Sequence, residues 1–218
     1  MRVAFALVAA MLAAVSAQAS AAVRQITPRA IAYIPEALTN PAPVIVLLHG
    51  AAGNARAFAE EFRQDIETRG AILLSVQSER QTWAVRKPSS KEADVANIRA
   101  AIEKLSATAS VDPKRISVMG FSDGASYALS VGMAYPDLFR SIVAFSPGYA
   151  FSPKRLYTDQ RIFIAHGRRD RVLTADNARQ IVKGLEAAGF DPEVHWFNGG
   201  HQIDPQLKQA GIDFALRP

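Results

Sequence analysis

The sequence has no cysteine among its 218 residues, which excludes disulfides, thiol nucleophiles and cysteine-ligated metals. Its longest apolar run, residues 4–15, is too short to cross a bilayer. Lys and Arg exceed Asp and Glu by only 25 to 20, and the one tight basic group, at Arg168, Arg169 and Arg171, has no interleaved aromatic residues. We therefore expect no nucleic-acid partner, and a fold that depends on its hydrophobic core.

The first residues differ from the rest of the chain. Arg2 gives a short positive start, residues 4–15 are apolar, and small residues in small-x-small order occupy positions 17–21. This is the layout of a secretory signal peptide. We predict a signal peptide over residues 1–22, one domain over 23–218, and an exported protein, periplasmic or secreted. An N-terminal membrane anchor is the alternative, but no charged stop follows the short run.

Strand-like and helix-like segments alternate along the remaining chain. Residues 44–48 form a continuous apolar run typical of a strand buried on both faces, whereas residues 91–107 have the three- and four-residue spacing of an amphipathic helix. This alternation predicts a mostly parallel sheet with helices on both faces. The expected strands are 30–34, 44–48, 71–76, 116–119, 141–145, 162–165 and 193–197, and the expected helices are 54–69, 91–107, 124–135, 174–189 and 203–216.

The most informative motif is Gly-Phe-Ser-Asp-Gly at residues 120–124, directly after the predicted strand 116–119 and before the predicted helix 124–135. Gly-x-Ser-x-Gly between a strand and a helix forms a sharp turn that holds the serine hydroxyl out at the carboxyl edge of the sheet. Glycines are needed there because neighbouring backbone passes close to the turn. The motif predicts that Ser122 is a nucleophile.

A nucleophilic serine needs a base, usually histidine, and four histidines are present. His201 follows Asn-Gly-Gly directly after the last predicted strand, at the carboxyl edge, and is our candidate base. His195 lies within a strand and is expected to be packed or partly buried. His49 and His166 each precede a glycine at a strand end and are expected to shape their loops through hydrogen bonds.

The histidine base is oriented by a carboxylate. Asp170 lies just past the predicted strand 162–165 and is our candidate, with helix capping or ion pairing to the adjacent arginines as the alternative. Asp176 is early in a predicted helix and is expected to serve its N-terminus. Asp204 precedes a proline and is expected to start the last helix.

Acyl chemistry also requires donors for the oxyanion that develops on the substrate. We expect one to be the backbone N–H of Asp123, at the start of the helix behind the serine. We expect the second to be the N–H of Ala51, in the small-residue loop 49–54. A plain strand-to-helix turn without this function is the alternative.

An aromatic residue is a candidate for the wall of a substrate pocket. Trp83 lies in the loop after the predicted strand 71–76, and we predict that it lines the pocket, with a packing role as the alternative. Phe121, Tyr149 and Phe151 are weaker candidates for the same role.

Four segments together resemble the α/β-hydrolase superfamily, in particular small serine carboxylesterases and phospholipase-like esterases of the dienelactone-hydrolase and polyhydroxybutyrate-depolymerase type. The resemblance implies a single-domain α/β-hydrolase fold with a minimal lid or none, since the segment between residues 145 and 161 is short. It implies Ser122, Asp170 and His201 as the triad, with Ala51 and Asp123 as oxyanion donors. The matching segments are LLHGAAG at 47–53, GFSDGA at 120–125, HGRRDRV at 166–172 and GGH at 199–201.

These observations predict an exported serine hydrolase that cleaves carboxylic esters through an acyl-enzyme, without a metal or organic cofactor. The expected substrate is a small-molecule or lipid-like ester. A peptidase or amidase on the same triad is the alternative, and a non-catalytic exported binding protein is a further one. Fold alone does not determine the substrate.

Overall fold

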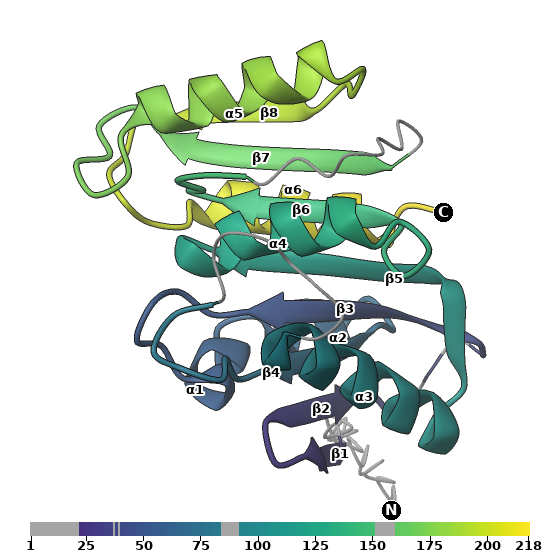
Figure 1. The fold of residues 1–218 in the computed structure, drawn as a ribbon. Coiled ribbons are helices and arrows are strands. Elements are labelled where there is room, and N and C mark those ends of the chain that lie inside the picture. The colour runs from purple at the N-terminus through teal and green to yellow at the C-terminus, as the bar shows by residue number, and fades with distance from the viewer. Residues whose placement is uncertain (1–21, 37, 39, 84–91, 151–159) are drawn as a thin grey trace, which may run out of the picture.

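The computed structural model describes residues 22–36, 38, 40–83, 92–150 and 160–218. Its centre is an eight-stranded sheet in the order β1-β2-β4-β3-β5-β6-β7-β8 (Figure 1). The pairs β1–β2 and β2–β4 are antiparallel, and all other pairs are parallel, as predicted. The strands are β1 (Ala22–Thr27), β2 (Ala30–Ile34), β3 (Ala42–Leu48), β4 (Ile72–Val76), β5 (Val111–Phe121), β6 (Ser141–Phe145), β7 (Arg161–Gly167) and β8 (Glu193–Phe197).

Helices cover both faces of the sheet (Figure 1). On one face lie α3 (Ala93–Thr108), α4 (Asp123–Ala134) and α5 (Ala175–Ala187), and on the other lie α1 (Ala55–Glu60), α2 (Arg63–Glu67) and α6 (Pro205–Leu216). Every residue of β3 is buried, because side chains on both of its faces meet a helix layer. The two resulting cores hold the central strands rigidly, and with them the loops at their carboxyl ends.

Two elements differ from the sequence-based expectation. The sequence does not predict β1, because its first four residues are exposed and it lacks the apolar run of a buried strand. Its backbone hydrogen bonds to β2 hold it at the edge of the sheet. The predicted helix 54–69 is divided into α1 and α2. At the junction, Glu61 and Phe62 donate to the carbonyls three residues back, the tighter pattern that ends an α-helix.

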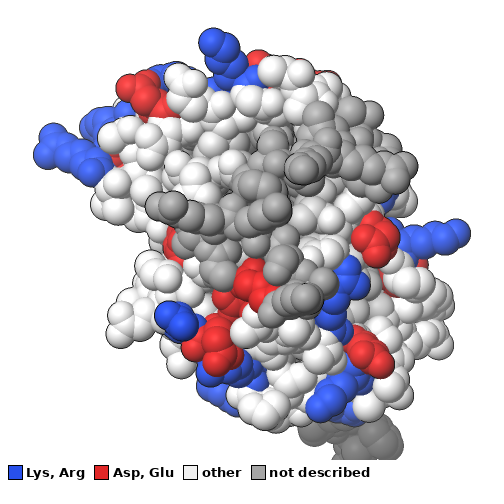
Figure 2. Space-filling model, viewed as in Figure 1, with Lys and Arg blue, Asp and Glu red and all other residues white. Residues whose placement is uncertain are grey.

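The N-terminal segment predicted to be a signal peptide lies outside the described residues, apart from Ala22, which begins β1. Within the described part of the chain, none of the helices has the length and apolar character needed to cross a membrane. Figure 2 shows positive and negative side chains interspersed over the visible face, in keeping with the scattered charges of the sequence.

Candidate active site

Ser122 lies in the sharp turn between β5 and α4, as its motif predicts. Its backbone has φ 58° and ψ −118°, in the region of positive φ that residues with a side chain rarely adopt. The turn is held by two backbone hydrogen bonds, from Ser122 N–H to the Phe145 carbonyl (2.9 Å) and from Ser126 N–H to the Ser122 carbonyl (3.0 Å). The side chain is thereby directed away from the sheet and helix.

The two glycines of the motif are required by packing. A Cβ on Gly120 would collide with the backbone of Gly124, and a Cβ on Gly124 would collide with the carbonyls of Leu48 and His49. Both obstacles are backbone, which cannot rotate away as a side chain can. The glycines therefore allow β5, α4 and the end of β3 to approach one another.

The structure brings the predicted nucleophile, base and acid into one chain of hydrogen bonds. His201 Nε2 lies 2.8 Å from Ser122 Oγ, and His201 Nδ1 lies 2.7 Å from Asp170 Oδ2. A carboxylate only accepts hydrogen bonds, so Nδ1 carries the proton and Nε2 is free to accept the serine hydroxyl proton. Asp176 and Asp204 lie elsewhere, as the sequence predicts: Asp176 is in the first turn of α5, where it pairs with Arg179, and Asp204 is the N-cap of α6.

Asp170 is buried and kept ionised by its neighbours. Burial alone would raise the pKa of this carboxyl, but the hydrogen bonds from His201 and from the N–H groups of Val172 and Leu173 outweigh it, and the net pKa is lowered. His166 completes the support, since its Nε2–H donates to the Leu173 carbonyl (2.8 Å) and lies 3.4 Å from Asp170 Oδ2. Burial lowers the pKa of His166. It therefore shapes the loop around Asp170, as predicted.

The loop 49–54, which carries the predicted oxyanion donor Ala51, is organised by His49. Its Nδ1 donates to the Gly50 carbonyl (2.7 Å), and its Nε2 accepts from the side-chain amide of Gln77 (2.9 Å) and the Ser78 N–H (3.2 Å). Gln77 also accepts from the Ala55 N–H at the start of α1. His49 shapes its loop, as predicted, and does not face Ser122 as a base.

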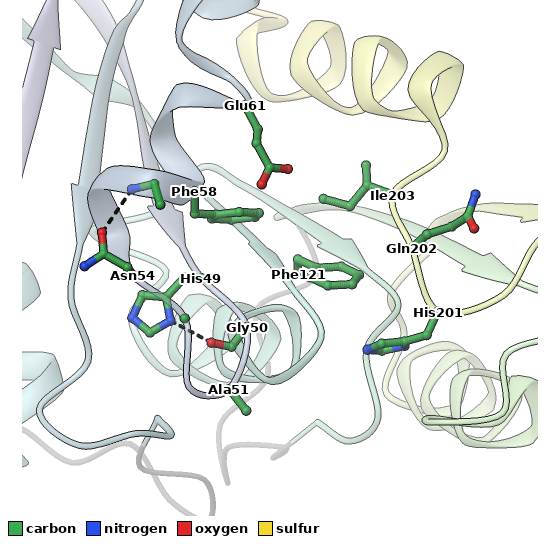
Figure 3. Close-up of a pocket in the computed structure, with 12 residues that line it drawn as sticks. His49, Gly50, Ala51, Asn54, Phe58, Glu61, Phe121, His201, Gln202 and Ile203 are labelled. Carbon is green, nitrogen blue, oxygen red and sulfur yellow. Dashed lines mark hydrogen bonds between the residues drawn. The ribbon is translucent and has the colours of Figure 1, made fainter.

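The two residues predicted to supply oxyanion donors lie next to Ser122 in the chain and in the lining of the pocket, respectively. Asp123 is the first residue of α4, where a backbone N–H has no acceptor within the helix. In the loop, the amide of Ala52 donates to the Gln81 carbonyl and that of Gly53 to the Gly50 carbonyl. Ala51 lies between Gly50 and these two, at the edge of the pocket described below (Figure 3).

The prediction that Trp83 lines the substrate pocket is wrong. Trp83 is only 1% exposed, stacks on Tyr127 (ring centroids 5.2 Å apart) and donates its indole N–H to the His49 carbonyl (2.7 Å). The Asp123 carboxylate accepts from the backbone N–H of Trp83 and from the Tyr149 hydroxyl. Trp83 is therefore part of the core that supports the loop and the serine turn. Phe151 lies outside the described residues.

Ser146 was missed by the sequence analysis. It follows β6 with φ 53°, is buried, and donates its N–H to the Ala165 carbonyl and its hydroxyl to the Gln202 carbonyl (3.3 Å). It thus holds the residue after His201 against the sheet. The only sequence signal was its place at a strand end, which does not distinguish it from an ordinary loop serine.

A cavity of about 490 Å³ opens beside His201 (Figure 3). Its size is within the range of small-molecule sites. The loop 49–54 forms one side, α1 another, and the chain after His201 a third, with Phe121 at its floor. Its lining residues are His49, Gly50, Ala51, Gly53, Asn54, Ala57, Phe58, Glu61, Phe121, His201, Gln202 and Ile203. Phe121 is one of the weaker pocket candidates from the sequence, whereas no sequence pattern points to Glu61.

Comparison with known proteins agrees with this architecture. The profile of the dienelactone hydrolase family matches residues 29–203, which include the serine turn, Asp170 and His201. The chain belongs to the dienelactone hydrolase family. It is a hydrolase with an α/β-hydrolase fold, as the sequence motifs predict.

Individual relatives are distant. A Bacillus subtilis (strain 168) protein named as a hydrolase, MhqD, is 23% identical over 73% of this chain and 86% of its own length. A Nocardia uniformis subsp. tsuyamanensis protein named as an esterase, NocK, is 26% identical over 83% of this chain but only 55% of its own length. The solved Bacillus cereus carboxylesterase superposes with a TM-score of 0.64 over 85% of this chain and 92% of its own, at 21% identity, which shows the shared fold.

Proposed function

We propose that this dienelactone hydrolase family member hydrolyses carboxylic esters through an acyl-enzyme on Ser122, with His201 as base and Asp170 as the group that orients it. The observation that carries the proposal is the continuous hydrogen-bond chain from Ser122 Oγ through His201 to Asp170. The names of the relatives support the ester as the bond that is cleaved.

The chemistry follows from the positions of these atoms. Ser122 Oγ attacks the ester carbonyl while His201 Nε2 takes its proton, and the buried Asp170 carboxylate stabilises the resulting imidazolium. The N–H groups of Asp123 and Ala51 donate to the oxyanion. His201 then returns the proton to the departing alcohol oxygen. A water molecule, deprotonated by His201, attacks the acyl carbonyl and regenerates Ser122.

The test is hydrolysis of p-nitrophenyl esters of increasing acyl length by the purified protein and by Ser122→Ala in parallel. We expect turnover by the native protein only, and an acyl adduct at Ser122 detectable by mass spectrometry. Hydrolysis that survives in folded Ser122→Ala would overturn the proposal. Cleavage of anilides but not esters would instead favour the amidase alternative.

We also propose that the protein is exported, on the strength of the charge and hydropathy pattern of residues 1–22. Expression of the full chain in a bacterial host, followed by fractionation and N-terminal sequencing, tests this. We expect a shortened chain beginning near residue 22 outside the cytoplasm. A full-length chain recovered from the cytoplasm would contradict it.

A further inference from the structure

Glu61 introduces a negative charge into the pocket beside Ser122. Among the described lining residues it is the only Asp, Glu, Lys or Arg, and its carboxylate points into the space bounded by Phe58, Phe121 and Ile203 (Figure 3). In the described part of the chain, no residue forms an ion pair or a side-chain hydrogen bond with it. The carboxylate is therefore available to a ligand.

Lys208, the cation that contacts the Glu61 backbone, is already paired. Lys208 donates to the Glu61 backbone carbonyl (2.9 Å), but its ammonium forms a 2.6 Å ion pair with Asp65. The neighbouring Arg63 interacts with Glu60 at the end of α1 and with Glu67 on its own helix, α2. The pocket thus presents an uncompensated negative charge, which opposes entry of an anionic substrate group.

Two phenyl rings adjoin this carboxylate. Phe58 and Phe121 line the same pocket with ring centroids 6.5 Å apart and planes inclined by 33°. Phe121 is in turn 5.0 Å from the His201 ring, so the aromatic wall extends from the reacting atoms toward Glu61. A carboxylate beside aromatic faces suits an ammonium group, which is attracted both by the charge and by the ring quadrupoles.

From this arrangement we infer that the substrate carries a cationic group, an ammonium on its acyl or alcohol part, held by Glu61 and the rings of Phe58 and Phe121. The inference rests on the proposed ester hydrolysis and specifies its substrate class. Neutral esters bind the same pocket without the charge attraction, and esters with a terminal carboxylate are rejected.

The experiment compares pairs of esters that differ in one atom and its charge. One pair is butyrylcholine and the butyrate ester in which a tert-butyl group replaces the trimethylammonium. The second is a p-nitrophenyl ester whose acyl chain ends in trimethylammonium, with its tert-butyl counterpart. We expect kcat/KM to be about tenfold higher for the cationic ester in one of the two pairs. A preference in the first pair places the alcohol part in the pocket, and a preference in the second places the acyl part there.

Variants assign the preference to Glu61. Glu61→Gln should bring kcat/KM for the cationic ester down to that of its neutral counterpart, and Glu61→Lys should reverse the preference in favour of a glutarate monoester. Glu103→Gln, an exposed carboxylate on α3 on the opposite face of the sheet, is the matched control and should retain the preference. Equal kcat/KM within both pairs, or a preference that survives Glu61→Gln, would overturn the inference.

A binding measurement separates this inference from the proposed function. In Ser122→Ala protein, calorimetry should show tighter binding of the cationic ester than of its neutral counterpart, and the difference should shrink in molar salt. If the native protein hydrolyses no ester but this difference is present, the proposed function fails and the cation site stands. If neutral esters are hydrolysed but the difference is absent, only the cation site fails.

Discussion

Two loops flank Ser122, and each contains a histidine in a different environment. In the loop 49–54, both ring nitrogens of His49 form hydrogen bonds within the protein, and the residue is 1% exposed. In the loop 199–203, His201 is partly exposed, and the one partner of its Nε2 among the described residues is the Ser122 hydroxyl. Both histidines follow a strand, but only His201 has an Nε2 that faces the hydroxyl of Ser122. The hydrogen-bond partner of Nε2 therefore decides which histidine can accept a proton from the nucleophile.

The largest effect should come from His201→Gln. This change removes the proposed base but keeps a polar side chain of similar size, so kcat/KM for an ester should fall on the order of 10⁴-fold. The free energy of unfolding should fall by about 1–2 kcal/mol, because the buried Asp170 carboxylate loses the hydrogen bond from His201 but keeps those from Val172 and Leu173. Ester kinetics and chemical denaturation measure the two quantities. Retained activity would mean that His201 is not the base, and that the two histidines do not differ in function as proposed.

His49→Gln should act mainly on stability. It breaks the hydrogen bond to the Gly50 carbonyl and disturbs those from Gln77 and Ser78, so we expect a loss of about 1–3 kcal/mol in unfolding free energy at pH 8. The loop that carries Ala51 loosens, and kcat should fall roughly tenfold. A fall in kcat as large as that of His201→Gln would mean that His49 takes part in the reaction.

The pH dependence of stability sharpens this prediction. Burial lowers the pKa of His49 below its ordinary 6.5, although the Gly50 carbonyl opposes the shift. Below pH 6.5 the unfolded chain therefore binds a proton that the folded protein resists, and the stability of the native protein falls as pH decreases, by at most about 1.4 kcal/mol per pH unit for this histidine. Denaturation from pH 8 to 5 should show the deficit of His49→Gln narrowing. A constant deficit would contradict a neutral buried His49.

Gly53→Ala should have a smaller effect in the same loop. The new Cβ would lie 2.8 Å from the Gly50 carbonyl oxygen and 2.9 Å from His49 Nδ1, so the hydrogen bond between them must shift. We expect a loss of about 1–2 kcal/mol in unfolding free energy and a several-fold lower kcat. Denaturation and ester kinetics check both. Unchanged values would show that the loop absorbs the methyl group.

Gly200→Ala is the matched change in the other loop and should have the smallest effect. Among the residues that the structure describes, its Cβ would meet only the Arg169 carbonyl oxygen, at 4.0 Å, and its backbone does not have positive φ. The unfolding free energy should stay within about 0.5 kcal/mol and kcat within about twofold. A loss of activity would mean that the position of His201 depends on the backbone flexibility of Gly200 and not on the space around it.

Much of the fold was predictable because its signals are local. The apolar run of β3 and the glycines around Ser122 each express a short-range requirement, and the structure bears them out. The polar edge strand β1 and the break between α1 and α2 were not predictable, because pairing with β2 and the packing of Phe58 and Phe62 override weak local signals.

The candidate site shows the same division. The sequence by itself determined that Ser122, Asp170 and His201 stand at the ends of strands. A glycine-flanked turn, or a strand followed by polar residues, can be recognised from a few consecutive residues. Only the tertiary structure decided that Ser122 and His201, 79 residues apart, meet at 2.8 Å, that Trp83 is a core residue, and that Glu61 faces the pocket. The physical reason is that contacts between distant segments depend on how the sheet and both helix layers pack, which no short stretch of sequence encodes.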